Sequence, residues 1–102
     1  MEQEKLDKLL TEVLALARAA GIPVSGRIDP RVAVNRRART RFGCCRGSRS
    51  GYTIELSAHT LRGGEEAVRR VLAHEVLHTC PGCADHGARW RAWAAVLGRA
   101  LG

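Results

Sequence analysis

The residues best suited to chemistry in this chain are two histidines that flank a glutamate within five positions. His74 and His78 are four residues apart, and Glu75 follows the first of them. On an α-helix, side chains four positions apart lie on one face about one turn apart, so both imidazoles can bind one metal ion. Glu75 lies about 100° around the helix from His74, where it can contact water activated by the metal. The spacing predicts a catalytic zinc site with Glu75 as general base.

The sequence around this motif favours a helix. Residues 65–73 begin with two acids and contain no glycine or proline, as expected for the first turns of a helix. Val68, Leu72 and Val76 recur every four residues and form an apolar stripe. The histidines and the glutamate then lie on an adjoining face. One helix can therefore pack against a core and present metal ligands.

A third ligand is needed, because a catalytic zinc ion usually binds three protein side chains and keeps a fourth position for water or substrate. His86 is the only histidine downstream of the motif. Pro81 and Gly82 end the first helix and allow the chain to reverse. We expect His86 to return to the metal and to open a second helix. Apolar and aromatic residues continue its pattern at helical spacing: Trp90, Trp93 and Leu97.

The segment His74–His78, followed eight residues later by His86-Gly87-Ala88-Arg89-Trp90, resembles the SprT-like family of zinc metallopeptidases. The pattern of that family is HExxH, a short connection, and then HGxxW or HGxxF. Residues 34–36, 41–44 and 54–57 resemble the short strands that precede the zinc helix in the family, and the match runs from about Pro23 to Leu97. The resemblance implies a zinc-dependent peptidase domain with one catalytic zinc ion. The implied ligands are His74, His78 and His86, and Glu75 is the implied base and proton shuttle.

The chain also differs from many members of that family. SprT-like proteins often carry a further zinc ribbon or partner-binding tails, whereas this chain stops at Gly102, so we expect a minimal catalytic domain over residues 1–102. The connection between the second and third histidines is short and holds two cysteines, as in small bacterial members. The family further implies DNA-associated or DNA-crosslinked proteins as substrates.

The composition limits the other possibilities. A chain of 102 residues with 45% apolar residues forms one domain with a modest core, which a bound metal would help to stabilise. No apolar run approaches the roughly 18 residues of a membrane span, and the acidic start is unlike a secretory signal. We therefore expect a cytoplasmic monomer.

The net charge of +7 comes from one segment of the chain. Residues 27–49 hold eight arginines and one acid, and the remaining bases and acids cancel. Arginine suits bidentate contacts with phosphate and stacking on bases, so this segment predicts a surface that binds DNA, single-stranded in preference to double-stranded. The alternative is a solvated arginine-rich face without a ligand. The candidate nucleic-acid-binding residues are Arg36, Arg37, Arg39, Arg41, Arg46 and Arg49.

The remaining patterns predict an α+β fold. Helical spacing of leucines covers residues 2–20, and short apolar runs at 24–28, 32–35, 40–45 and 52–56 predict a small, mainly antiparallel sheet. Glycines and serines at 47–51 predict a flexible hairpin loop. One edge strand beside the cleft, either 40–45 or 52–56, would pair with the backbone of a peptide substrate. Tyr52 is expected to pack within its strand, or less readily to steady an oxyanion.

Four cysteines leave a second interpretation open. Cys80 and Cys83 have the spacing of a redox or zinc pair, and Cys44 and Cys45 could add to it, so a structural zinc, a reversible disulfide and packed thiols are all possible. If the metal were structural, the protein would be a zinc-stabilised nucleic-acid-binding module without peptidase activity. Glu75 argues against this alternative, because a structural site needs no base beside its ligands.

Overall fold

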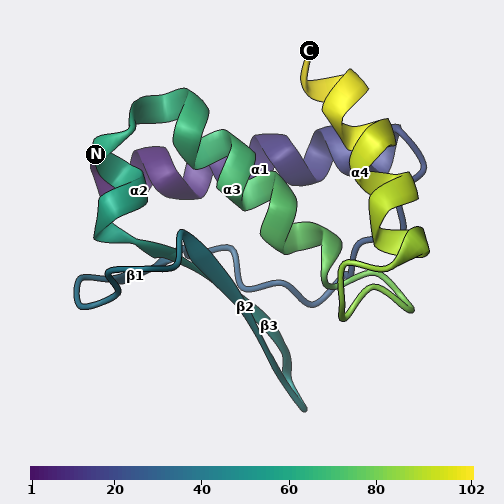
Figure 1. Cartoon of the computed structure of the whole chain (residues 1–102), viewed down its shortest axis with the longest axis horizontal. Helices are drawn as coiled ribbons and strands as arrows, with labels where there is room; N and C mark the ends of the chain where they lie inside the picture. The colour runs from purple at the N-terminus through teal and green to yellow at the C-terminus, as the bar shows by residue number, and fades with distance from the viewer.

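The structure, a computed structural model, describes residues 1–102 and contains four helices and one three-stranded sheet. Figure 1 shows the helices above the sheet, with α4 at the right and the sheet below α3. This arrangement confirms the predicted α+β class. The helices are α1 (Gln3–Ala19), α2 (Ala58–Arg62), α3 (Gly64–Leu77) and α4 (Ala88–Leu101). The strands are β1 (Ala33–Asn35), β2 (Gly43–Ser48) and β3 (Gly51–Ser57).

The sheet has the order β1-β3-β2, which places β3 in the centre and β2 at an edge. β2 and β3 form an antiparallel hairpin of six residue pairs, whereas β1 adds three parallel pairs on the other side of β3. The hairpin closes in a tight turn at Arg49 and Ser50, because Ser48 pairs with Gly51. Of the two candidates, 40–45 and 52–56, the first therefore lies at an edge, although its strand begins at Gly43 and ends at Ser48.

The strand expected at 24–28 is absent. Only one bridge forms there, between Ile28 and Tyr52. The backbone N–H of Ser25 donates to the Thr79 hydroxyl at 3.0 Å, and the N–H of Arg27 donates to the Ser25 hydroxyl at 3.0 Å. Because side chains take these backbone donors, the segment cannot use them in a ladder.

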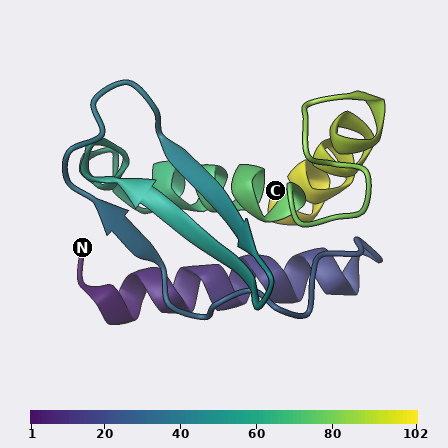
Figure 2. The ribbon, with the colours of Figure 1, turned by 90° about the horizontal axis from the view of Figure 1, so that it is seen from below.

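Helices α1 and α3 cover one face of the sheet and leave the other face uncovered, as Figures 1 and 2 show together. Ile54 and Leu56 alternate with Glu55 on β3, so the two apolar side chains enter the core and the acid lies on the uncovered face. Helix α3 contacts α1, α4, β2 and β3. It is therefore the central element around which the site is built.

Two sets of side-chain hydrogen bonds fix the elements around α3. The Asp7 carboxylate of α1 accepts from the N–H of Val32 at 2.9 Å, and the side-chain amide of Gln3 donates to the Val32 carbonyl at 2.8 Å. These two bonds tie α1 to the residue just before β1. At the end of β3, the Ser57 hydroxyl accepts from Thr60 N–H at 3.2 Å and begins the short helix α2. None of the helices has both the length and the apolar composition needed to cross a membrane.

Candidate metal centre

The two histidines of the motif lie at the C-terminal end of α3. His74 lies in the last turn of the helix, and His78 occupies its C-cap position with φ −67° and ψ −13°. The apolar stripe fixes the rotation of the helix, since Val68, Leu72 and Val76 are fully buried. Both imidazoles consequently face the same side, with ring centroids 5.3 Å apart.

The third histidine reaches the same point from the loop between α3 and α4. Nε2 of His86 lies 2.9 Å from Nε2 of His74 and 3.1 Å from Nε2 of His78. Zinc binds histidine nitrogen at about 2.0–2.1 Å, and a tetrahedral arrangement then separates two ligand nitrogens by about 3.3 Å. Nε2 of His86 thus lies near ligand spacing from both other nitrogens, all three ligand atoms lie within 4.8 Å of one another, and these histidines can hold a metal ion.

The expectation that His86 opens the second helix is wrong. Helix α4 begins at Ala88, and Gly87 before it has an extended backbone with φ −72° and ψ −171°. The N–H of Gly87 donates to the Asp85 carboxylate at 2.9 Å, so a side chain turns the chain before the helix starts. A loop, braced at both ends by helices, thus supplies the third histidine.

The ring nitrogens of His78 have distinct partners. Its Nδ1 lies 2.8 Å from the carbonyl oxygen of Cys83. Because a carbonyl only accepts, Nδ1 carries the proton, and Nε2 turns its lone pair toward the other two histidines.

Burial lowers the pKa of His74, and the neighbouring His78 and His86 lower it further. The surroundings of His74 therefore favour its neutral form, which is the form that binds a metal ion.

Trp90 supports all three histidines. Its ring centroid lies 4.8 Å from those of His74 and His86 and 5.8 Å from that of His78. The indole Nε1 is buried without a hydrogen-bond partner. The sequence predicted Trp90 as a core residue, and it does pack against the core. Its second contact surface, the histidine cluster, depends on the path of the loop and could not be predicted from helical spacing.

Glu75 lies beside the histidine cluster and is almost completely buried. Its Oε2 is 3.9 Å from Nε2 of His74, and the residue is 7% exposed. Burial raises the pKa of its carboxyl group above the ordinary value, while the nearby His86 lowers it in part. A carboxylate whose pKa is raised is a stronger base than an ordinary one, and beside a metal site it is suited to accept and return a proton.

Strand β2 approaches Glu75 closely at Gly43. A Cβ atom on Gly43 would lie 2.6 Å from Cγ1 of Val71 and 3.3 Å from Cγ of Glu75. Only glycine fits there without a shift of α3 or β2. The motif did not point to Gly43, because its role depends on a contact between distant segments.

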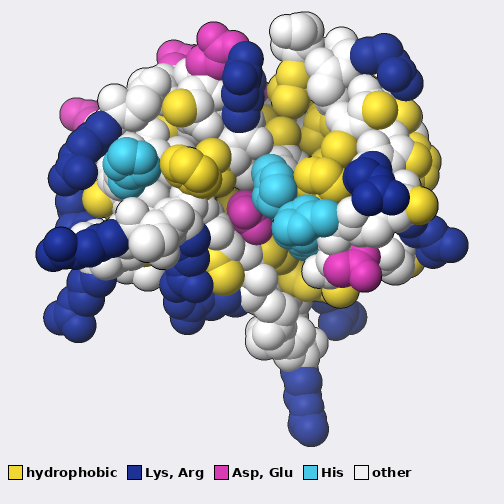
Figure 3. Space-filling model, viewed as in Figure 1, with side chains coloured by type: hydrophobic (Ala, Val, Ile, Leu, Met, Phe, Trp, Pro, Cys, Tyr) yellow, Lys and Arg dark blue, Asp and Glu magenta, His cyan; other side chains and the backbone are white.

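These elements enclose a cleft of about 490 Å³ between the hairpin, the end of α3 and the following loop. Figure 3, viewed from the same side as Figure 1, shows histidine side chains next to an acidic one in the centre of the surface. The side chain of Tyr52, expected to pack within its strand, also lines the cleft. The cleft is lined by Gly43, Cys44, Cys45, Tyr52, His74, Glu75, His78, Ala84 and His86.

A comparison with protein families adds an independent finding. Residues 15–101 match the SprT-like family. The chain belongs to the SprT-like family. The resemblance seen in the histidine motif is thereby confirmed over a longer stretch than the motif itself. A comparison with curated proteins found no match.

The four cysteines of this SprT-like chain are free, and none joins the histidine cluster. Burial raises the pKa of Cys80 to about 11, and Cys83 beside it adds to the effect. Burial also raises the pKa of Cys45 to about 11, with contributions from Glu75 and Cys44. Thiols that stay protonated at neutral pH are poor nucleophiles. Of the three interpretations, packed thiols agree best with these surroundings.

The arginines of residues 27–49 lie outside the metal cleft, most of them on the connections of the sheet. Arg36, Arg37 and Arg39 are exposed between β1 and β2, and Arg49 is exposed in the hairpin turn. Figure 3 shows basic side chains along the left and lower margins of the face that carries the histidines. The exposed residues Arg36, Arg37, Arg39 and Arg49 thus lie on the two connections that join β2 to the other strands, and no arginine lines the metal cleft.

Two of the predicted arginines already have an acidic partner. Arg41 lies 3.5 Å and Arg46 lies 3.1 Å from the carboxylate of Glu55, whose side chain is 12% exposed. The Asn35 amide donates to the same carboxylate at 3.3 Å. Glu55 thus holds both guanidinium groups against the uncovered face of the sheet. This shared acid was not predicted, because only the pairing of β2 with β3 brings the three residues together.

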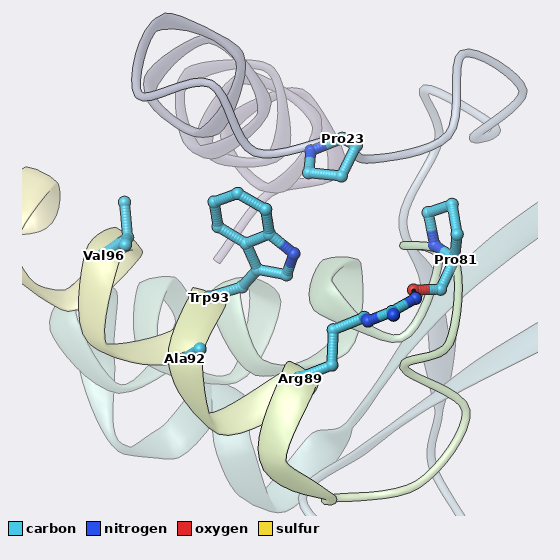
Figure 4. Close-up of a pocket in the computed structure, with 6 residues that line it drawn as sticks. All are labelled: Pro23, Pro81, Arg89, Ala92, Trp93 and Val96. Atoms are coloured by element: carbon cyan, nitrogen blue, oxygen red, sulfur yellow. Dashed lines mark hydrogen bonds between the residues drawn. The ribbon is translucent and has the colours of Figure 1, made fainter.

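A separate apolar pocket of about 370 Å³ lies on the other side of the loop that carries His86. Figure 4 shows Trp93 of α4 facing Pro23, and Arg89 extending toward Pro81, whose carbonyl oxygen accepts from Arg89 Nη1 at 3.4 Å. None of the residues that line this pocket lines the histidine cleft. The pocket is therefore separate from the candidate metal centre.

Proposed function

We propose that the protein is a zinc-dependent endopeptidase that acts in the cytoplasm on DNA-associated or DNA-crosslinked proteins. The observation that carries the proposal is the convergence of three histidine nitrogens beside a buried glutamate that is not part of the ligand group. A structural zinc site usually has four protein ligands, often thiolates, and needs no base. Here no thiol joins the histidines, and Glu75 has the position of a base.

His74, His78 and His86 would hold the zinc ion, which when bound polarises a peptide carbonyl and acidifies water. Glu75 accepts the proton of the attacking water on its carboxylate, close to His74. It then returns the proton to the amide nitrogen of the leaving segment. The Cys83 carbonyl holds His78 in the tautomer that this ligand set needs.

The edge of the sheet offers a binding surface for the substrate backbone. Ser57 N–H donates to the Phe42 carbonyl at 3.0 Å, so the main-chain groups of Phe42 face β3. In an antiparallel pair of strands, the N–H and C=O groups of successive residues point alternately toward the partner strand and away from it. The main-chain groups of Gly43 and Cys45 therefore point away from β3 and toward the cleft. An extended peptide can pair with these groups as an added strand, largely independent of its sequence.

Nucleic acid would bring the enzyme to its substrates. The exposed arginines of residues 36–49 lie on strand β2 and on the connections at its two ends, and they lack acidic partners except at Arg41 and Arg46. Arginine-rich surfaces bind phosphate groups with a strong dependence on salt, and single-stranded DNA also exposes bases on which guanidinium groups stack. Binding of substrate protein and peptidase to one DNA strand raises their effective concentration.

The test is cleavage of a basic DNA-binding protein by zinc-loaded enzyme, with and without single-stranded DNA. We expect cleavage that DNA stimulates, and a loss of at least about 100-fold in Glu75→Gln, the size of effect typical of general base catalysis. The variant should keep its zinc, measured by elemental analysis. Glu66→Gln is the matched control, because this exposed glutamate of α3 is paired with Arg70. Absence of cleavage despite bound zinc and bound DNA would instead support a binding module.

A further inference from the structure

A second hollow of about 410 Å³ adjoins the metal cleft on the other side of Glu75. It shares Gly43, His74 and Glu75 with the metal cleft, so the two hollows meet at the candidate base. The residues that line it are Arg41, Phe42, Gly43, Arg70, Val71, His74 and Glu75. We infer that this hollow is a specificity subsite that takes a large apolar side chain of the peptide substrate. The inference rests on the proposed peptidase function.

Phe42 gives the subsite its apolar surface. This side chain is 59% exposed, more than any other large hydrophobic residue of the chain, although water contact costs free energy. Its backbone is held firmly, since its carbonyl accepts from Ser57 N–H at 3.0 Å and from the Thr60 hydroxyl at 2.7 Å. The ring of His59 lies 5.8 Å from the Phe42 ring and supports it from α2. The aromatic ring is thus presented on a fixed backbone beside the cleft.

The arginines of the subsite do not favour an acidic side chain. Arg70 lies 3.0 Å from the Glu66 carboxylate, and Arg41 lies 3.5 Å from that of Glu55. Both charges therefore have partners, while the aliphatic stems remain to form walls with Val71. Apolar atoms make up most of the lining. This chemistry selects leucine, methionine or an aromatic residue over a charged one.

The position of the hollow indicates which substrate residue enters it. Residues 41–43, at and just before the start of β2, line this hollow, and residues 43–45 of β2 line the metal cleft. Along α3, Arg70 and Val71 of this hollow likewise precede His74 and His78. A peptide paired with β2 therefore passes both hollows in succession, and His74 and Glu75 lie where the two hollows meet. The apolar side chain must belong to a residue immediately next to the bond that is cut.

The experiment uses zinc-loaded full-length protein and a set of peptides that differ only in the residues next to one scissile bond. We expect kcat/KM to be at least about 10-fold higher for leucine than for glycine at one of these positions, the lower end of what hydrophobic pockets discriminate. Phe42→Ala should remove most of this preference by lowering kcat/KM for the leucine peptide toward the value for the glycine peptide. Phe42→Leu should restore part of the preference. Leu16→Ala, which alters an exposed apolar residue of α1, is the matched control.

A second readout separates this inference from the proposed function. The methyl signals of Val71, followed by nuclear magnetic resonance, should shift when the leucine peptide is added and should shift less with the glycine peptide. Shifted Val71 signals without cleavage would contradict the proposed peptidase activity but support the proposed apolar subsite. Cleavage with the same preference in wild type and Phe42→Ala, or equal shifts with both peptides, would overturn the subsite.

Discussion

The metal centre and the arginine-rich segment differ in how firmly the fold holds their side chains. Each histidine of the cluster contacts the other two and the ring of Trp90, and a backbone carbonyl fixes the tautomer of His78. Most of the arginines lie on exposed connections, and two are held by one acid, Glu55. Chemistry needs nitrogens placed within fractions of an ångström, whereas attraction of a polyanion needs only charge of the right sign nearby.

The largest effect is expected when a ligand is removed from the rigid region. His86→Ala should weaken zinc binding by more than about 100-fold, the upper end of what loss of a supporting residue costs, because two histidines cannot complete the site. Competition with a chromophoric chelator measures the affinity. His59→Ala removes an exposed histidine outside the cluster and should bind zinc like wild type. Equal affinities in the two variants would show that the metal is not bound by this cluster.

Removal of the support beneath the ligands should have the next largest effect. Trp90→Ala leaves all three histidines in place but takes away the ring that packs on them. Zinc affinity should fall by about 10- to 100-fold, the usual cost of removing a supporting residue. Trp90→Phe should have a smaller effect, since a smaller aromatic ring still fills part of the space. An unchanged affinity in Trp90→Ala would mean that the loop alone positions His86.

This contrast explains which parts of the molecule could be predicted from sequence. The periodicity of α1 and α3 and the spacing of His74 and His78 are local, so the helices and the motif could be predicted from short windows. Gly43 matters because β2 approaches Val71 and Glu75, and Glu55 matters because β2 pairs with β3. Such contacts join segments distant in sequence, and no local pattern contains them.

The errors have the same origin. Residues 24–28 have the alternation of a strand, but Thr79, far along the chain, takes the backbone donor of Ser25. His86 continues the helical spacing of Trp90, yet the Asp85 carboxylate turns the chain first and delays α4 to Ala88. In both places a side chain competed for a backbone donor and ended the regular pattern.

A smaller effect is expected for the arginine-rich segment. Arg36→Gln and Arg37→Gln together should lower the dependence of single-stranded DNA binding on salt. The slope of log K against log salt should fall by about 0.7 for each phosphate group that the double variant no longer neutralises. Glu55→Gln should act in the opposite direction, because it frees Arg41 and Arg46 for phosphate.

Fluorescence anisotropy at several salt concentrations measures both effects. Arg99→Gln, near the end of α4, is the control of equal charge outside the segment. The change in the slope caused by Arg99→Gln is compared with half of the change caused by the double variant. If the two are equal, only the net charge of the protein matters, and Arg36 and Arg37 form no specific surface.

The smallest effect concerns the free-energy cost of burying the ionised Glu75 carboxylate in the folded protein. Because burial raises the pKa of this carboxyl group in the folded protein, ionisation destabilises the folded state. The penalty is full above the folded pKa and disappears below the pKa of the unfolded chain, near 4.5. Glu75→Gln should therefore raise the Tm of the metal-free protein by roughly a few degrees at pH 8 and leave it unchanged at pH 4, given about 4–8 °C per kcal/mol for a domain of this size.

Thermal unfolding followed by circular dichroism at the two pH values tests this sign. Glu66→Gln should show no such dependence, since Glu66 is exposed and lies in a surface ion pair with Arg70. An equal Tm change at both pH values would mean that packing of the amide, and not loss of the charge, stabilises the variant. The opposite sign would mean that the metal-free fold favours the carboxylate, which would remove the physical reason for assigning Glu75 as the base.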